Sequence, residues 1–111
     1  MSELEELDAI IAAYQASHLE EDGKRVAERF KHMAHTIFDV MKLPPTILGA
    51  PTEEEAVRFV VFVAFSRLHL YDPAKGKAFN YFTTVMLNYW RKEHKRWKKR
   101  EKLEGMYGRY L

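Results

Sequence analysis

Apolar side chains recur every three or four residues through four segments of the chain, the spacing that gathers residues on one side of an α-helix. The first helix is expected over residues 3–19, where Ser2 and Glu5 have the spacing of a capping box. The second is expected over residues 24–41, because the two prolines at positions 44 and 45 cannot continue it. Both segments carry one apolar stripe, so each helix is expected to bury one face.

Two more helices and no strand are predicted in the second half of the chain. Thr52 and Glu55 have the spacing of another capping box and mark the start of the third helix. Asn80 is the expected N-cap of the fourth helix, which would run over about residues 81–102. The pattern therefore predicts an all-α fold with four helices.

The expected third helix is apolar nearly all the way round. Its valines and phenylalanines over residues 57–65 would also suit a strand, but the length of the segment and its capping box favour a helix. Two interpretations remain open: a core helix buried on all sides, or a helix that packs one face inside and presents the other to a protein partner. In the second case residues 53–55 and Arg58 would form a polar rim.

The expected fourth helix carries apolar and aromatic side chains on two faces. One face holds Phe82, Val85, Met86 and Tyr89. The other holds Leu87, Trp90, His94 and Trp97. One of these faces must be core, and the other could stack on unpaired bases. The spacing does not distinguish them.

Length and composition agree with a single soluble domain. With 111 residues the chain is long enough to bury a core, so we expect a compact four-helix domain over residues 1–104 and a short flexible tail over residues 105–111. The absence of cysteine excludes disulfides and thiolate metal sites. No apolar run reaches the roughly 20 residues of a membrane span, and the acidic N-terminus is unlike a signal peptide, so a cytoplasmic protein without a membrane partner is expected.

Charge is distributed very unevenly along the chain. Residues 91–102 hold eight Lys and Arg against two Glu, while residues 1–22 hold seven acidic residues and no Lys or Arg. The basic run includes Lys92, Lys95 and Arg96, and such density favours a polyanionic partner over a merely solvated face or an acidic protein. Lys75 and Lys77, in the turn before the fourth helix, could add phosphate contacts.

Catalysis finds little support in the sequence. His32 and His35 are three residues apart on the expected second helix, but no third metal ligand has suitable spacing. There is no P-loop, no dinucleotide-binding glycine motif and no H-E-x-x-H. The chain is therefore not expected to be an enzyme or to need a cofactor.

The segment FSRLHLYDPAKGKAFNYFTTVMLNYWRKE resembles region 2 of bacterial sigma factors. That family shows an aromatic-Asp-Pro turn, then a basic residue, a glycine, a phenylalanine and a small polar residue that caps the promoter-melting helix. Here these are Tyr71, Asp72, Pro73, Lys75, Gly76, Phe79 and Asn80. The resemblance is closer to the short late-transcription sigma factors of T-even-type bacteriophages and covers roughly residues 4–101.

This resemblance implies a sigma factor that binds core RNA polymerase and then recognises and opens a −10-like promoter element, in the cytoplasm of a bacterial host. The partners would be the coiled coil of the polymerase clamp and the non-template strand of the −10 element. The tail could engage a coactivator or sliding clamp. The implied polymerase-binding residues are Glu55, Arg58, Val61, Phe62 and Phe65.

The implied promoter-melting surface follows the turn and the fourth helix. Its members are Tyr71, Lys77, Phe79, Tyr81, Phe82, Val85 and Met86. Tyr89, Lys92 and Arg96 would approach duplex DNA just upstream. Val85 and Met86 occupy the positions at which housekeeping sigma factors carry a tryptophan pair, so opening is expected to be weaker or to need a helper. Two alternatives stay open: a single-stranded nucleic-acid-binding module without polymerase contact, and a sigma-like inhibitor that binds polymerase.

Overall fold

The computed structural model describes the backbone of residues 3–110 and the side chains of residues 6–106. This part of the chain is all-α, with four α-helices and no strand, which confirms the predicted fold class. The helices are α1 (Glu3–Ser17), α2 (Glu20–Met41), α3 (Glu53–Ser66) and α4 (Ala78–Tyr110). Three short 3-10 helices connect them: η1 (Pro45–Leu48), η2 (Leu68–Leu70) and η3 (Pro73–Lys75).

The ends of the helices follow local chemistry. Thr52 Oγ1 accepts a hydrogen bond from the backbone N–H of Glu55 at 3.3 Å, so the capping residue predicted for α3 is confirmed. The start of α2 was predicted too late: it lies at Glu20, and its first turn carries three acidic residues that favour a helix N-terminus. Ser2, the expected cap of α1, lies outside the described residues.

A close approach joins α1 and α2. A Cβ atom at Gly23 would lie 3.0 Å from the Tyr14 ring, closer than an ordinary contact, so a larger residue there would require the ring to shift. Further along α2, Lys31 pairs with Glu54 (3.2 Å), and His35 lies 3.3 Å from Glu53. These contacts tie α2 to the first turn of α3.

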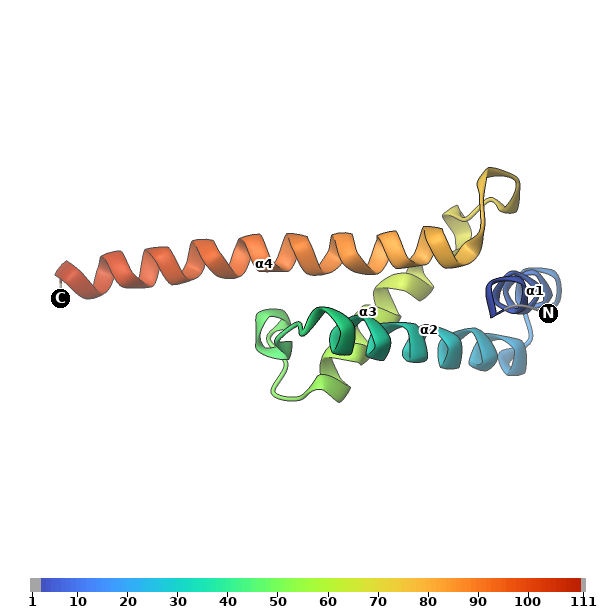
Figure 1. The fold of residues 1–111 in the computed structure, drawn as a ribbon, viewed down its shortest axis with the longest axis horizontal. Helices are drawn as coiled ribbons and strands as arrows, with labels where there is room; N and C mark the ends of the chain where they lie inside the picture. Colours follow the sequence, from blue (N-terminus) through green and yellow to red (C-terminus); the bar gives the residue numbers. More distant parts are fainter. Residues whose placement is uncertain (1–2, 111) are drawn as a thin grey trace.

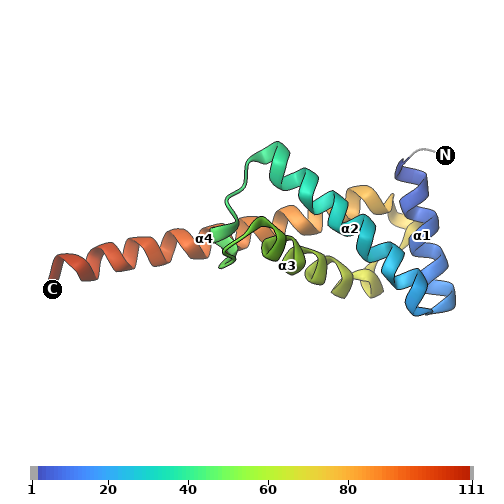
Figure 2. The ribbon, with the colours of Figure 1, turned by 90° about the horizontal axis from the view of Figure 1, so that it is seen from below.

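The four helices meet at one end of the molecule, where α2 and α3 lie beside α4 and α1 packs across the end (Figures 1 and 2). The largest fully buried side chains come from all four: Ile11 of α1, Phe30 of α2, Val57 of α3, and Phe82 of α4. The Phe30 and Phe82 ring centroids are 4.6 Å apart. The core therefore lies at this junction, and α4 contributes one of its two central rings.

The C-terminal half of α4 extends well beyond the other helices (Figure 1). The radius of gyration is 16.7 Å, against about 13 Å for a globular domain of this length. The predicted helix end near Lys102 is therefore wrong, and most of the tail expected at residues 105–111 is helical. Lys, Arg, Glu and Leu at residues 98–104 all favour helix, and Gly105 is too mild a breaker, at about 1 kcal/mol, to end it.

The start of α4 also differs from the prediction. The helix begins at Ala78, and Asn80 is exposed within its first turn instead of capping it. The capping acceptor comes from α1: Asp8 Oδ1 accepts a hydrogen bond from the Ala78 N–H at 2.7 Å. No cap spacing in the local sequence could reveal an acceptor 70 residues away.

Substitution of Phe82 should unfold the core. We expect Phe82→Ala to lower the free energy of unfolding by about 3–5 kcal/mol, because its fully buried ring leaves a cavity against Phe30. Phe79→Ala, whose side chain is 39% exposed, is the matched control and should cost less than about 1.5 kcal/mol. Urea unfolding followed by circular dichroism measures both, and equal midpoints would contradict the assigned core.

Candidate nucleic-acid interface

The turn before α4 is fixed by its own side chains. Asp72 accepts a hydrogen bond from the N–H of Ala74 at 2.9 Å and caps η3. Gly76 has a φ of 152°, which favours glycine over residues with a Cβ. Tyr71 packs beneath the turn, and its hydroxyl donates to the Gly76 carbonyl oxygen at 2.9 Å. The exposed lysines of the turn, Lys75 and Lys77, are thereby held beside the first turns of α4.

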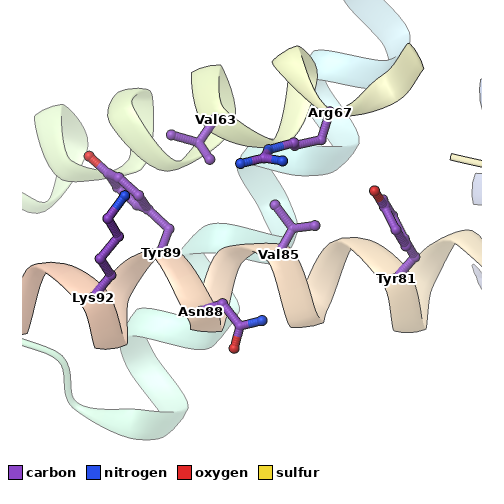
Figure 3. A pocket seen from close by; sticks show the side chains of 7 residues that line it. All are labelled: Val63, Arg67, Tyr81, Val85, Asn88, Tyr89 and Lys92. Carbon is purple, nitrogen blue, oxygen red and sulfur yellow. The ribbon is translucent and has the colours of Figure 1, made fainter. Parts of the chain in front are cut away.

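Three adjoining depressions form one groove along α4. The first lies beside the turn and ends at Tyr81; the second lies between α3 and α4 and runs from Tyr81 to Lys92 (Figure 3). The third continues from Asn88 and Lys92 along the basic stretch to Lys99. The shared residues make the three parts continuous over roughly 30 Å of helix.

We call this feature the α4 groove. Its members on α4 recur every three or four residues, so they share one side of the helix. From the turn and α4 its lining residues are Leu70, Tyr71, Asp72, Lys75, Gly76, Lys77, Asn80, Tyr81, Thr84, Val85, Asn88, Tyr89, Arg91, Lys92, Lys95, Arg96 and Lys99. Val63 and Arg67 of α3 form the opposite wall of the middle part (Figure 3).

The α4 groove is strongly positive. Eight of its side chains are Lys or Arg, and Asp72 at the turn is its only acidic lining residue among the described side chains. Within the same part of the chain, Arg96 is the one groove cation in an ion pair, with Glu93 at 3.1 Å. Cations without counter-charges along one line are the arrangement that binds a phosphate backbone.

Two tyrosines give the groove aromatic surface. Tyr81 and Tyr89 are half-buried and line its middle part, with Val85 between them (Figure 3). The Tyr81 ring lies against the Tyr71 ring, with centroids 5.4 Å apart, so its orientation is supported from behind. Burial, followed by the nearby carboxylate of Glu93, raises the pKa of Tyr89, which favours the neutral hydroxyl. Partly exposed tyrosine rings among cations can stack on bases.

Three residues predicted to contact DNA are placed elsewhere. Phe82 and Met86 are 0% and 2% exposed, so these two side chains belong to the core and do not present a face to DNA. Phe79 is exposed but lies two residues from Tyr81, on the opposite side of α4, and does not line the groove. These placements arise because Ala78, Phe82 and Met86 form the buried stripe of α4. A neighbouring side of the helix therefore faces outward.

The other nine predicted residues line the α4 groove, and the buried Tyr71 ring closes its end beside the turn. They are Tyr71, Lys75, Lys77, Tyr81, Val85, Tyr89, Lys92, Lys95 and Arg96. The predicted DNA contacts lacked ten lining residues: Val63 and Arg67 at the α3 side, Leu70, Asp72 and Gly76 at the turn, and Asn80, Thr84, Asn88, Arg91 and Lys99 of α4. Helical spacing alone could have added Asn88, Arg91 and Lys99 to the stripe. Arg67 could not be found in this way, because its place in the groove depends on how α3 packs against α4.

The outer side of α3 carries exposed phenylalanines. Ala56, Val57, Val60 and Ala64 face the core, whereas Phe62 is 74% exposed and Phe59 is 45% exposed. Of the predicted polymerase-binding residues, Glu55, Arg58 and Phe62 lie on this outer side. Val61 and Phe65 are instead half-buried against the core, and Phe65 packs on Tyr14 with ring centroids 5.5 Å apart.

The all-round apolar character of α3 therefore has two causes. One side of α3 packs in the core. The other side exposes the rings of Phe59 and Phe62, which the packing of the core does not require. The residues Glu55, Arg58, Phe59 and Phe62 define the outer α3 face. Of the two interpretations of this helix, the structure rules out full burial.

The histidine pair on α2 is not gathered into a metal site. His32 is exposed, while His35 lies between Glu53 (3.3 Å) and Glu54 (3.5 Å) at the α2–α3 contact. The hydrogen bond and charge of Lys31 lower the pKa of Glu54, which keeps this contact charged. Among the described residues no group of three or more His, Asp or Glu side chains is arranged to hold a metal ion. Nor, in that same part, is any helix long and apolar enough to cross a membrane.

The chain was compared with protein-family models, with curated proteins and with solved structures. None of these comparisons gave a match. Function is therefore inferred from the two surfaces described above, the α4 groove and the outer α3 face.

Proposed function

We propose that this protein is a sigma-type transcription factor. In this proposal the outer α3 face binds core RNA polymerase, and the α4 groove holds the unpaired non-template strand of a −10-like promoter element. The observation that carries the proposal is the α4 groove itself, which brings eight Lys and Arg side chains from the end of α3, the turn and α4 together with two half-exposed tyrosines of α4. RNA polymerase is proposed as the protein partner because of the sequence resemblance to sigma factor region 2.

The outer α3 face supports a protein partner. Phe62 and Phe59 expose rings that bury a large apolar area when covered, and aromatic anchors dominate the energetics of interfaces. Glu55 and Arg58 lie at the edge of these rings and can form polar contacts around them. This corrected set replaces the five residues expected from the sequence, because Val61 and Phe65 are largely used inside the domain.

The α4 groove supports a single strand over a duplex in its first half. Base stacking on Tyr81 and Tyr89 needs unpaired bases, whereas Lys75, Lys77 and Arg67 can neutralise the phosphates between them. Beyond Lys92 the groove is purely polar and basic, which suits the backbone of a neighbouring duplex. One helix would thus follow the strand from unpaired to paired DNA.

In promoter opening, the groove is suited to hold a strand that has already separated. It is less suited to part a base step with an inserted side chain. Phe82 and Met86 are core residues, and of the side chains proposed to part a base step only Val85 lines the groove. Such a surface stabilises a strand that has already come apart. The initial opening would then depend on the polymerase or on a helper protein.

Co-elution with core RNA polymerase tests the proposal most directly. The protein should elute with core polymerase on a sizing column and should support initiation on a template that has a −10 element and no −35 element. Absence of co-elution at micromolar concentration would remove the sigma-type function.

A second candidate is a single-stranded nucleic-acid-binding module without polymerase contact. The burial of Phe82 and Met86 favours it, because the surface that remains needs no polymerase to bind an unpaired strand. Oligonucleotide binding without co-elution would identify this case. Polymerase binding without permanganate-reactive thymines at the promoter would instead indicate a sigma-like inhibitor.

Removal of one groove cation should weaken binding in a salt-dependent way. Lys92→Ala should lower the affinity for a fluorescein-labelled oligothymidylate and reduce the slope of log K against log salt by about 0.7, because one phosphate contact is lost. Lys24→Ala, an exposed cation on α2 outside the groove, is the control and should leave the slope unchanged. Fluorescence anisotropy over a salt series measures both, and equal slopes would argue against the groove.

A charge on the outer α3 face should abolish polymerase binding. Phe62→Glu is expected to remove co-elution while leaving the helical circular-dichroism signal unchanged, since this ring is 74% exposed. Val40→Glu is the matched control: Val40 is 75% exposed and lies nine residues beyond Lys31, on the side of α2 away from α3. Loss of polymerase binding in both variants would show that the effect is not specific to α3.

A further inference from the structure

We propose that Asp8 of α1 is a positioning residue for the α4 groove. Its carboxylate links the turn at residues 71–77 and the start of α4 to α1, the first helix of the chain. The inference rests on the proposed nucleic-acid binding of the groove and adds a residue that touches no nucleic acid. In this view α1 sets the geometry at which Lys75, Lys77 and Tyr81 meet a strand.

One carboxylate oxygen makes the contacts that carry this inference. Asp8 Oδ1 accepts the Ala78 N–H at 2.7 Å and lies 3.3 Å from the hydroxyl of Tyr71. The same hydroxyl donates to the Gly76 carbonyl oxygen at 2.9 Å. Asp8 therefore contacts the first residue of the turn and the first residue of α4, and the Tyr71 hydroxyl in turn binds the Gly76 carbonyl oxygen.

The hydrogen bond between Asp8 and the Ala78 N–H should contribute more to stability than a helix cap that is exposed to solvent. Ala78 is fully buried, so its N–H would lose its partner in a place that water reaches poorly. A carboxylate at a helix N-terminus is also favoured by the helix dipole. Burial, and after it the charge of Asp8, raises the pKa of Tyr71, which keeps its hydroxyl protonated as a donor.

The position of the turn decides what enters the groove. Lys75 and Lys77 are exposed on it, and the part of the groove beside it is closed by Tyr71 and Tyr81, whose rings contact each other. Among the described residues the turn has no other side-chain hydrogen bond to α1, α2 or α3. Release of the Asp8 contact should therefore let both lysines move away from the strand.

A second α1 carboxylate separates positioning from stability. Glu6 pairs with Arg29 of α2, so it also joins α1 to the domain, but it lies outside the α4 groove. Glu6→Ala thus removes a tertiary contact of α1 without touching the turn. Asp8→Asn keeps an acceptor for the Ala78 N–H and serves as the conservative rescue.

The experiment compares the full-length protein with Asp8→Ala, Asp8→Asn and Glu6→Ala in binding to labelled oligothymidylate. It is done over a salt series, at a temperature where circular dichroism shows each variant folded. Asp8→Ala should bind more weakly and reduce the salt slope by about 0.7 to 1.4, the loss of one or two phosphate contacts. Asp8→Asn and Glu6→Ala should keep the wild-type slope.

Other outcomes overturn the inference. A wild-type slope in Asp8→Ala, or the same reduction in Glu6→Ala, would show that Asp8 acts only on stability, with groove binding itself intact. No binding by the wild-type protein would remove the proposed nucleic-acid function and the inference with it. Should Asp8→Ala not fold, Tyr71→Phe decides, because it removes the hydroxyl that links Asp8 to the Gly76 carbonyl oxygen; an unchanged slope there would also overturn the inference.

Discussion

The packing of Phe82 against Phe30 determines how the rest of the molecule is arranged. The two rings meet at 4.6 Å between centroids, and both are fully buried. This contact sets the rotation of α4 about its own axis, because Ala78 and Met86 must then also face inward at the four-residue spacing of a helix. With that side fixed, Tyr81, Val85 and Lys92 fall on a neighbouring side, and the α4 groove forms there. The groove is thus a geometric consequence of the core.

The sequence predicted local features well and relationships between helices poorly. The capping threonine of α3 and the basic run were found because they depend on neighbours in the chain. The two faces of α4 could not be ranked, because both carry large apolar residues and only tertiary contacts, such as that of Phe82 with Phe30, make one of them core. The capping of α4 by Asp8 was missed for the same reason, as its partners are 70 residues apart. The longer α4 was within reach of the sequence, since residues 98–104 are good helix formers and a glycine costs a helix only about 1 kcal/mol.

The projecting half of α4 reflects a conflict between charge and burial. Residues 91–102 carry eight cations and cannot be packed against the domain without large desolvation costs. The cations of this half repel one another, so its helical structure depends on the N-terminal half of α4. Packing of that half against the domain provides the helix nucleus, and the helix then extends from it residue by residue. A polyanion bound along the groove would relieve the repulsion. Binding and helix stability would then reinforce each other at low ionic strength, and both would weaken as salt is added.

Simple energetics indicate why strand capture would need polymerase. Stacking a base on an aromatic side chain contributes about 1–3 kcal/mol, so Tyr81 and Tyr89 together offer roughly 2–6 kcal/mol. Each base-pair step of a duplex holds about 1.4 kcal/mol on average, so the two tyrosines offset only a few steps. A protein that binds the open state can shift melting by no more than its preference for that state. Opening a whole −10 element would therefore require more contacts than this groove provides. The outer α3 face, with Phe59 and Phe62 exposed at the neighbouring helix, would recruit the partner that supplies them.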